Sequence, residues 1–214
     1  GTPRQVIAVG PFVKISAALT HSLGITADGR LWAWGWNYFG QLGDGTTATR
    51  YSPVVIGTGY AGAAACDTHS LGLKSDGSLW VWGNNTWGQL GDGTSLSRLS
   101  PTKIGIGFTA ISCGFLHSLA LKDDASLWTW GNNASGQLGD VTTTNRMIPT
   151  VIGIGFAAIS AGGNHSLAIR TDGSLEAWGE NSSGQLGDGT TVNRSRTVTI
   201  GTGFSGIAAG SNHS

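Results

Sequence analysis

Apolar and polar side chains alternate along a stretch that recurs through the whole chain. In HSLGLKSDGSLWVWG (residues 69–83) the leucines of the first half share one face of an extended strand, and Trp80 and Trp82 share one face of a second strand. Asp76 and Gly77 supply the positive φ angles of a tight hairpin turn between them. The positions beside the tryptophans are apolar too, so both faces of the hairpin must be covered.

Two shorter segments precede this hairpin. PVVIG (residues 53–57) is followed by the small-residue run GAAAC (residues 62–66), which later copies rewrite as AISCG and AISAG. Small side chains allow backbones to crowd, as the innermost strand of a radial array requires. We therefore predict four strands per copy. The glycine density, the Asp-Gly turns and the alternating aromatics all argue against helix.

The copies recur with a period of 48 residues. Every histidine falls on this spacing and is followed by serine: His21, His69, His117, His165 and His213. Periods of roughly 40 to 50 residues are typical of β-propeller blades. We predict an all-β fold, a β-propeller built from four-stranded antiparallel blades within one domain or domain fragment, 1–214. The predicted repeats cover residues 3–52, 53–100, 101–148 and 149–196, with a partial fifth at 197–214.

Composition agrees with a turn-rich β protein. The chain of 214 residues has 36 glycines and nine tryptophans but only 11% charged residues. Twelve Lys and Arg balance twelve Asp and Glu, so no net charge draws the molecule toward nucleic acid or an anionic membrane. No apolar run reaches the roughly 20 residues of a membrane span. We expect neither nucleic-acid binding nor membrane insertion.

The two cysteines are predicted to be free, buried thiols. Cys66 lies three residues before His69, whereas Cys113 lies four before His117, which places the cysteines in neighbouring registers of successive repeats. Adjacent registers of a strand point to opposite faces, which disfavours a disulfide. This interpretation leaves the redox compartment open.

The motif GQLGD occurs once in each full repeat and is interpreted as scaffold. We expect its leucine to anchor a long loop, its glycines to allow tight turns, and its aspartate to accept backbone N–H bonds. An arginine six residues after each aspartate is expected to bind that aspartate or loop carbonyls. A phosphate cradle needs a following helix and, in one version, a lysine, which these segments lack.

Neither a catalytic group nor a metal site or cofactor is predicted. The repeated histidines have no recurring Cys, Asp or Glu at ligand spacing, so each is expected to be buried and hydrogen-bonded to backbone. No nucleophile elbow occurs. The two glutamates, Glu176 and Glu180, are interpreted as a solvated polar edge rather than an acid–base pair.

Variation between the copies marks a candidate partner-binding site. The residues before GQLGD read WNYF and NNTW in the first two repeats, but NNAS and ENSS in the next two. Trp36, Tyr38, Phe39 and Trp87 thus gather aromatic rings at one loop position. Two interpretations remain open: an interface for a protein or sugar, or packing under the loop. The aromatics that recur in every copy are assigned to the core: Tyr60, Phe108, Phe156 and Phe204.

The unit AGGNHSLAIRTDGSLEAWGENSSGQLGDGTT (residues 161–191) resembles the regulator of chromosome condensation repeat, in a form typical of bacterial or viral proteins. The resemblance covers nearly the whole chain and implies a seven-bladed propeller with four strands per blade. Founding members of the family are guanine-nucleotide exchange factors for a small GTPase and dock on chromatin. Their protruding wedge and basic tail have no counterpart in the even 48-residue periods.

These observations predict a non-enzymatic structural or interaction module that presents propeller loops to a protein or glycan partner. Nucleotide exchange and glycan binding as a lectin are the alternatives. Low charge and a surface rich in Gly, Ser, Thr and Asn favour an extracellular or virion setting. The chain is expected to be a piece of a longer propeller, to complete a ring or stack with other copies, or to close on itself through the segment 3–18.

Overall fold

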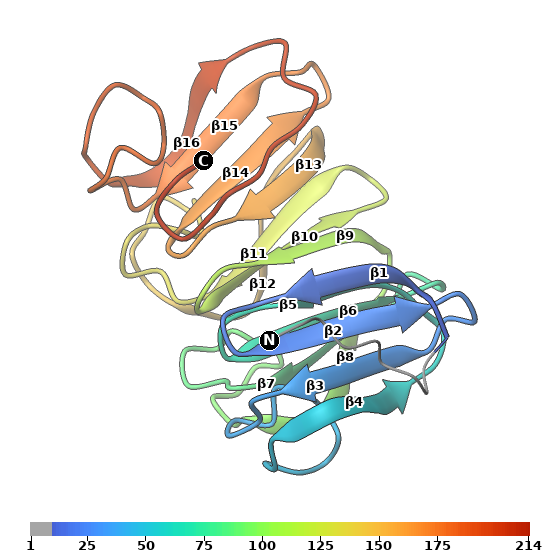
Figure 1. The fold of residues 1–214 in the computed structure, drawn as a ribbon. Coiled ribbons are helices and arrows are strands. Elements are labelled where there is room, and N and C mark those ends of the chain that lie inside the picture. Colours follow the sequence, from blue (N-terminus) through green and yellow to red (C-terminus); the bar gives the residue numbers. More distant parts are fainter. Residues whose placement is uncertain (1–9) are drawn as a thin grey trace, which may run out of the picture.

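A computed structural model describes residues 10–214 and shows four separate β-sheets. Each sheet is antiparallel and has four strands that pair in chain order. The sheets stack side by side in an arc, with β1–β4 at one end and β13–β16 at the other (Figure 1). These are the predicted propeller blades, and we call each contact between neighbouring blades a joint. None of the described residues forms a helix that is long and apolar enough to cross a membrane.

The four blades follow one another along the chain. The first contains β1 (Phe12–Ala17), β2 (His21–Thr26), β3 (Leu31–Gly35) and β4 (Arg50–Gly57). The second contains β5 (Tyr60–Ala65), β6 (His69–Lys74), β7 (Leu79–Gly83) and β8 (Arg98–Gly105). The third contains β9 (Phe108–Cys113), β10 (His117–Lys122), β11 (Ser126–Gly131) and β12 (Arg146–Ile154). The fourth contains β13 (Phe156–Ala161), β14 (His165–Arg170), β15 (Leu175–Gly179) and β16 (Arg194–Gly201).

One strand belongs to a different sheet from the one that its sequence suggested. The segment PVVIG lies in β4, which pairs with β3 and not with the hairpin that follows it. The reason is that the hairpin of β2 and β3 leaves an open strand edge, and the long loop after β3 brings the chain back to cover it. The small-residue strand β5 then begins the next blade, as expected for an innermost strand.

The hydrophobic core lies between the blades. One cluster joins Leu23, Leu31 and Leu42 of the first blade to Tyr60 and Trp82 of the second. Equivalent clusters fill the following joints. Both faces of an inner blade are therefore covered, which explains the apolar residues on both sides of each hairpin.

The end of the described chain starts a fifth blade without completing it. Residues 204–214 run along β13, where the Ala209 N–H donates to Ser160 Oγ (2.9 Å). The recurring aromatics at 60, 108 and 156 are buried as predicted, but Phe204 is 39% exposed. Phe204 was wrongly assigned to the core because no strand of the described chain follows β16 to cover it. Of the segment 3–18 proposed to close a ring, residues 3–9 lie outside the described residues, and the remainder belongs to the first blade.

Candidate functional site

A long loop joins the third and fourth strands of every blade, and a buried asparagine holds it together. In the first blade Asn37 Nδ2 donates to Asp44 Oδ1 (3.1 Å) and to the carbonyls of Thr46 (3.0 Å) and Ala48 (3.1 Å). The Leu42 N–H donates to Asn37 Oδ1 (2.9 Å). The same role falls to Asn85, Asn133 and Asn181. Sequence reasoning missed these asparagines, although their 48-residue spacing was visible.

The roles predicted for GQLGD are confirmed in each loop. The leucine anchor is fully buried at Leu42, Leu90 and Leu138 and 2% exposed at Leu186. Asp92 accepts the Thr94 N–H (3.0 Å) and forms an ion pair with Arg98 (2.6 Å). Burial alone would raise the pKa of Asp92, but the hydrogen bonds from Thr94 and Arg98 outweigh it and lower that pKa.

Three of the four predicted site residues form one cluster on the loop of the first blade. Trp36 and Tyr38 are 38% and 68% exposed, and their rings stack with centroids 5.9 Å apart. Phe39 is half-buried and packs edge-on against both rings, at 5.5 Å and 5.1 Å. We call these three residues the aromatic loop cluster. Trp87 is 43% exposed on the second blade and makes no aromatic ring contact with the cluster in the described chain.

The backbone beneath the cluster is fixed by the same loop. The Phe39 N–H donates to Gln41 Oε1 (3.0 Å). Asn37, which lies between Trp36 and Tyr38 in the sequence, is fully buried. Exposed rings on a rigid loop lose little conformational entropy on binding. The cluster can therefore act as a preorganised apolar contact, and the equivalent loops of the third and fourth blades present polar side chains instead.

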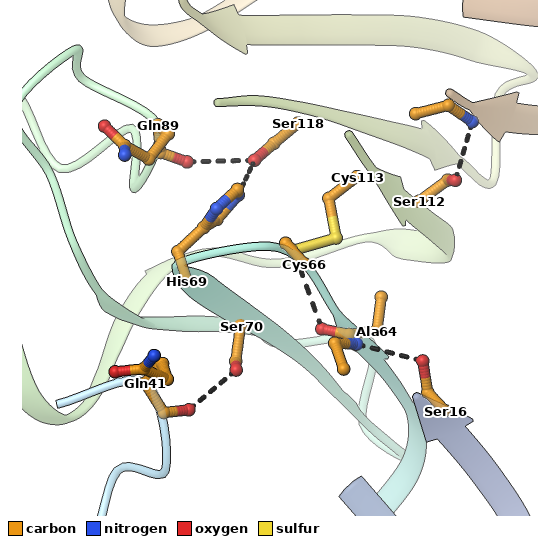
Figure 2. Close-up of a disulfide and its surroundings, with 12 residues drawn as sticks. Ser16, Gln41, Ala64, Cys66, His69, Ser70, Gln89, Ser112, Cys113 and Ser118 are labelled. Carbon is orange, nitrogen blue, oxygen red and sulfur yellow. Dashed lines mark hydrogen bonds between the residues drawn. A yellow bond between two sulfur atoms is a disulfide. The ribbon is translucent and has the colours of Figure 1, made fainter. Parts of the chain in front are cut away.

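The repeated histidines bridge neighbouring blades. His69 Nε2 lies 2.9 Å from Ser118 Oγ on the next blade, and Ser118 donates to the Gln89 carbonyl (2.9 Å), as Figure 2 shows. Because the hydroxyl gives its single hydrogen to Gln89, His69 must donate from Nε2, which leaves the lone pair on Nδ1. His21, His117 and His165 make the same contact with Ser70, Ser166 and Ser214.

Burial was predicted correctly for His21, His69, His117 and His165, but His213 is exposed. The predicted hydrogen-bond partner was wrong. The expected bond to backbone is replaced by a bond to a serine of the next blade, because the second strand of that blade, such as β10 with Ser118, places its serine opposite the ring across the joint. Burial lowers the pKa of His69 and His117 to about 3, and that of His21 and His165 to about 4. These imidazoles are therefore neutral near pH 7.

The cysteines form a disulfide, so the prediction of two free thiols was wrong. Cys66 and Cys113 are bonded with their Cα atoms 5.6 Å apart. The alternation rule holds along one strand, whereas these residues lie at the ends of two different innermost strands that run side by side. Cys66 follows β5 and Cys113 ends β9, and their one-residue stagger brings them together across the joint.

Glu176 is buried and paired, which corrects its interpretation as a solvated edge. Glu176 is only 4% exposed. Its Oε1 accepts hydrogen bonds from Arg170 Nε (3.1 Å) and Thr199 Oγ1 (2.9 Å). In the second blade this position holds Trp80, with Lys74 Nζ 4.6 Å from the ring centroid. An ion pair thus replaces a cation–π contact. Glu180 bonds elsewhere, to Asn164 and Ser182.

Four similar blades, joined by repeated contacts from histidine to serine and from serine to a glutamine carbonyl, define a β-propeller repeat protein. The family model of the regulator of chromosome condensation (RCC1) repeat matches residues 28–73, 76–121, 124–169 and 172–214. A second model of this repeat matches residues 12–41, 108–137 and 156–185. The chain belongs to the RCC1 repeat family.

The chain is similar to several characterised proteins. It is 44% identical over 43 residues to the ultraviolet-B receptor UVR8 of Arabidopsis thaliana, which covers 20% of this chain and 10% of UVR8. The structure of human WBSCR16 superposes with a TM-score of 0.85 at 24% identity, covering 94% of this chain and 56% of the other. Prp20p of Saccharomyces cerevisiae gives 0.86 at 21%, covering 98% and 57%. The chain thus spans little more than half the length of these two solved proteins, and the likeness shows the fold.

Proposed function

We propose that this protein is a non-enzymatic interaction module that binds a protein partner through the aromatic loop cluster of its first blade. The observation that carries the proposal is the exposure of Trp36 and Tyr38, stacked on each other over a loop whose backbone is fixed by buried Asn37 and Gln41. Aromatic residues on rigid supports are the side chains that contribute most to protein interfaces.

The surrounding blades support a binding role rather than catalysis. Each described imidazole from His21 to His165 is used to bridge two blades, and the repeated aspartates are used to close loops on arginine. The groups most suited to acid–base chemistry thus serve the scaffold. The RCC1 repeat propeller is a fold that carries protein interactions, and the solved Prp20p structure is described together with its binding to Gsp1p and histones.

The loops themselves supply the variant that tests the proposal. Trp36→Asn, Tyr38→Ala and Phe39→Ser together give the first loop the residues of the third loop, NNAS, which the same scaffold already accommodates. Proteins retained by the wild-type chain should be identified, purified and titrated against both forms. We expect the variant to keep its unfolding midpoint and to lose at least about tenfold in affinity, because aromatic anchors each contribute more than about 1 kcal/mol. Undiminished binding of every identified partner would overturn the proposal.

Two alternatives are tested in the same preparation. Nucleotide exchange predicts faster release of labelled GDP from a small GTPase when the protein is added. A lectin predicts quenching of the exposed tryptophans during glycan titration, abolished by the same triple substitution. Trp87→Ala serves as a separate arm, because Trp87 lies on the next blade and outside the cluster. If it reduces binding as much as the triple variant, the interface extends across both blades.

A further inference from the structure

The joint between the second and third blades differs from its neighbours. Between the first and second blades the Ala65 N–H donates to Ser16 Oγ (2.9 Å), and between the third and fourth the Ala161 N–H donates to Ser112 Oγ (3.0 Å). At the corresponding position of the second blade the residue is Ala64, which has no hydroxyl. The disulfide is found at this joint in place of the serine contact (Figure 2).

A third soft ligand lies beside the two sulfur atoms. The ligand atoms of Cys66, His69 and Cys113 all lie within 4.8 Å of one another. His69 Nδ1 is buried and has no hydrogen-bond partner within residues 10–214. The other bridging histidines share that feature, but the residue three positions before them is Ala18, Gly114 or Gly162, so none has a thiol at this place.

The neighbouring contacts show where the Nδ1 lone pair of His69 points. A Cβ added at Gly114 would meet Cε1 and Nδ1 of His117, so the residue three before each histidine faces this edge of the ring. In the second blade that residue is Cys66. The opposite ring nitrogen of His69 donates to Ser118, whose hydroxyl is committed to Gln89. Zinc-binding histidines are held in this way, with the second ring nitrogen donating to an outer partner that fixes the tautomer.

We propose that, after reduction of the disulfide, Cys66, Cys113 and His69 bind a zinc ion between the second and third blades. Two thiolates and one imidazole are ligands that zinc prefers, and three protein ligands leave a fourth position for water or another donor. Zn–S bonds of about 2.3 Å at a tetrahedral ion require the two sulfurs to stand about 3.8 Å apart, a separation that side-chain rotation can supply once the covalent bond is broken. The metal would then replace the disulfide as the link across this joint.

The reaction is balanced with a phosphine as reductant. The sulfur–sulfur bond takes up two electrons and two protons to give two thiols, while the phosphine gains an oxygen atom from water. Zinc binding then releases two protons as the thiols become thiolates. Both cysteines line a hollow of about 270 Å³ at the ends of the innermost strands, which gives the reductant and the ion a path to the site.

Cobalt(II) is the probe, because its complexes with thiolate ligands have intense visible and near-ultraviolet absorption. The whole chain should be reduced with a phosphine without oxygen and titrated with Co²⁺, followed by Zn²⁺. We expect one tetrahedral Co²⁺ per chain, with release of two protons as the cobalt binds, and displacement of that cobalt by one Zn²⁺ without further proton release. The oxidised chain should show none of these. A reduced chain with two titratable thiols and no 1:1 cobalt complex would overturn the proposal.

Matched variants separate ligands from scaffold. Cys66→Gly and Cys113→Ala introduce the residues that other repeats carry at these positions, so they should fold and lose the cobalt spectrum. Ser118→Ala should weaken zinc binding about 10- to 100-fold, because it removes the outer partner of His69. Ser166→Ala makes the same change beside His117, which has Gly114 at the position where His69 has Cys66, and should leave zinc affinity unchanged. Equal effects of the two serine variants, or a cobalt spectrum that survives Cys66→Gly, would contradict the assignment.

Discussion

The imidazole Nε2 of His117, on the third blade, lies 2.9 Å from the hydroxyl oxygen of Ser166 on the fourth. Both residues are fully buried. Ser166 passes its hydrogen to the Gln137 carbonyl (2.9 Å), which also accepts from Trp178 Nε1 (2.8 Å). One backbone carbonyl of a GQLGD loop thus receives both polar links from the next blade, so the loop motif and the histidine motif stabilise the same joint.

Ser166→Ala should destabilise the protein by about 1–3 kcal/mol, because it leaves the His117 N–H buried without its acceptor. The free energy of unfolding in urea measures the effect. Ser22 holds the same position in the first blade and makes no side-chain hydrogen bond in the described part of the chain, so Ser22→Ala is the control and should change stability little. Equal losses for the two variants would show that the bridge contributes nothing specific.

Stability should fall as the pH drops below about 6.5. The pKa values of His69 and His117 are lowered to about 3 by burial, from 6.5, so between these values the unfolded chain binds more protons than the native chain. By linkage, the native state is fully stable above pH 6.5 and loses stability progressively toward pH 3. At pH 5.5 each of these two histidines should cost about 1.4 kcal/mol.

Urea unfolding at pH 8, 6.5, 5.5, 4.5 and 3.5 checks this prediction. The carboxylates add a second, more acidic phase: the pKa of Asp92 is lowered from 3.8, so its contribution is complete above about pH 4 and lost below it. Asp92→Asn should weaken only this later phase. Constant stability between pH 8 and pH 5 would contradict the neutral, buried state of the histidines.

Val141→Gly should stabilise the protein by about 1 kcal/mol. Val141 has a φ of 68°, where the other three loops place Gly45, Gly93 and Gly189 at similar angles. This left-handed conformation costs L-residues roughly 1–2 kcal/mol, and a branched side chain is especially unsuited to it. Val141 is 72% exposed, so little packing is lost on its removal. Thermal unfolding measures the gain, with Val192→Gly, an exposed loop position, as the control. A lower midpoint for Val141→Gly would show that the side chain has a role of its own.

The strands were predictable because each repeats a local pattern. Period-two alternation located the hairpin of residues 69–83, and the Asp-Gly pair located its turn. The long loops were recognised as scaffold because GQLGD recurs while WNYF does not. PVVIG was placed in the wrong sheet because the pairing of β4 with β3 depends on where the long loop of residues 36–49 returns the chain, and not on local alternation.

The candidate site was predictable only as a set of residues. The sequence located Trp36, Tyr38 and Phe39 by their departure from the repeat, but their mutual stacking depends on the loop conformation that Asn37 and Gln41 impose. Trp87 is separate because it lies on the loop of the second blade, which Asn85 and Gln89 hold. The cysteines show the same limit more strongly. Register along a single strand argued for separation, whereas the distance between two neighbouring strands brought Cys66 to Cys113.

By itself, the sequence determined the blade: its strands, its turns, its period and the residues that every copy reuses. These features depend on interactions within about 48 residues, and the sequence motif for each of them occurs in all four full repeats. The tertiary structure decided what each residue meets across a joint, including the serine opposite each histidine, the disulfide, and the burial of Glu176 beside Arg170. Those contacts join residues of separate blades or opposite strands, and their geometry is set by how the sheets stack, which no local pattern records.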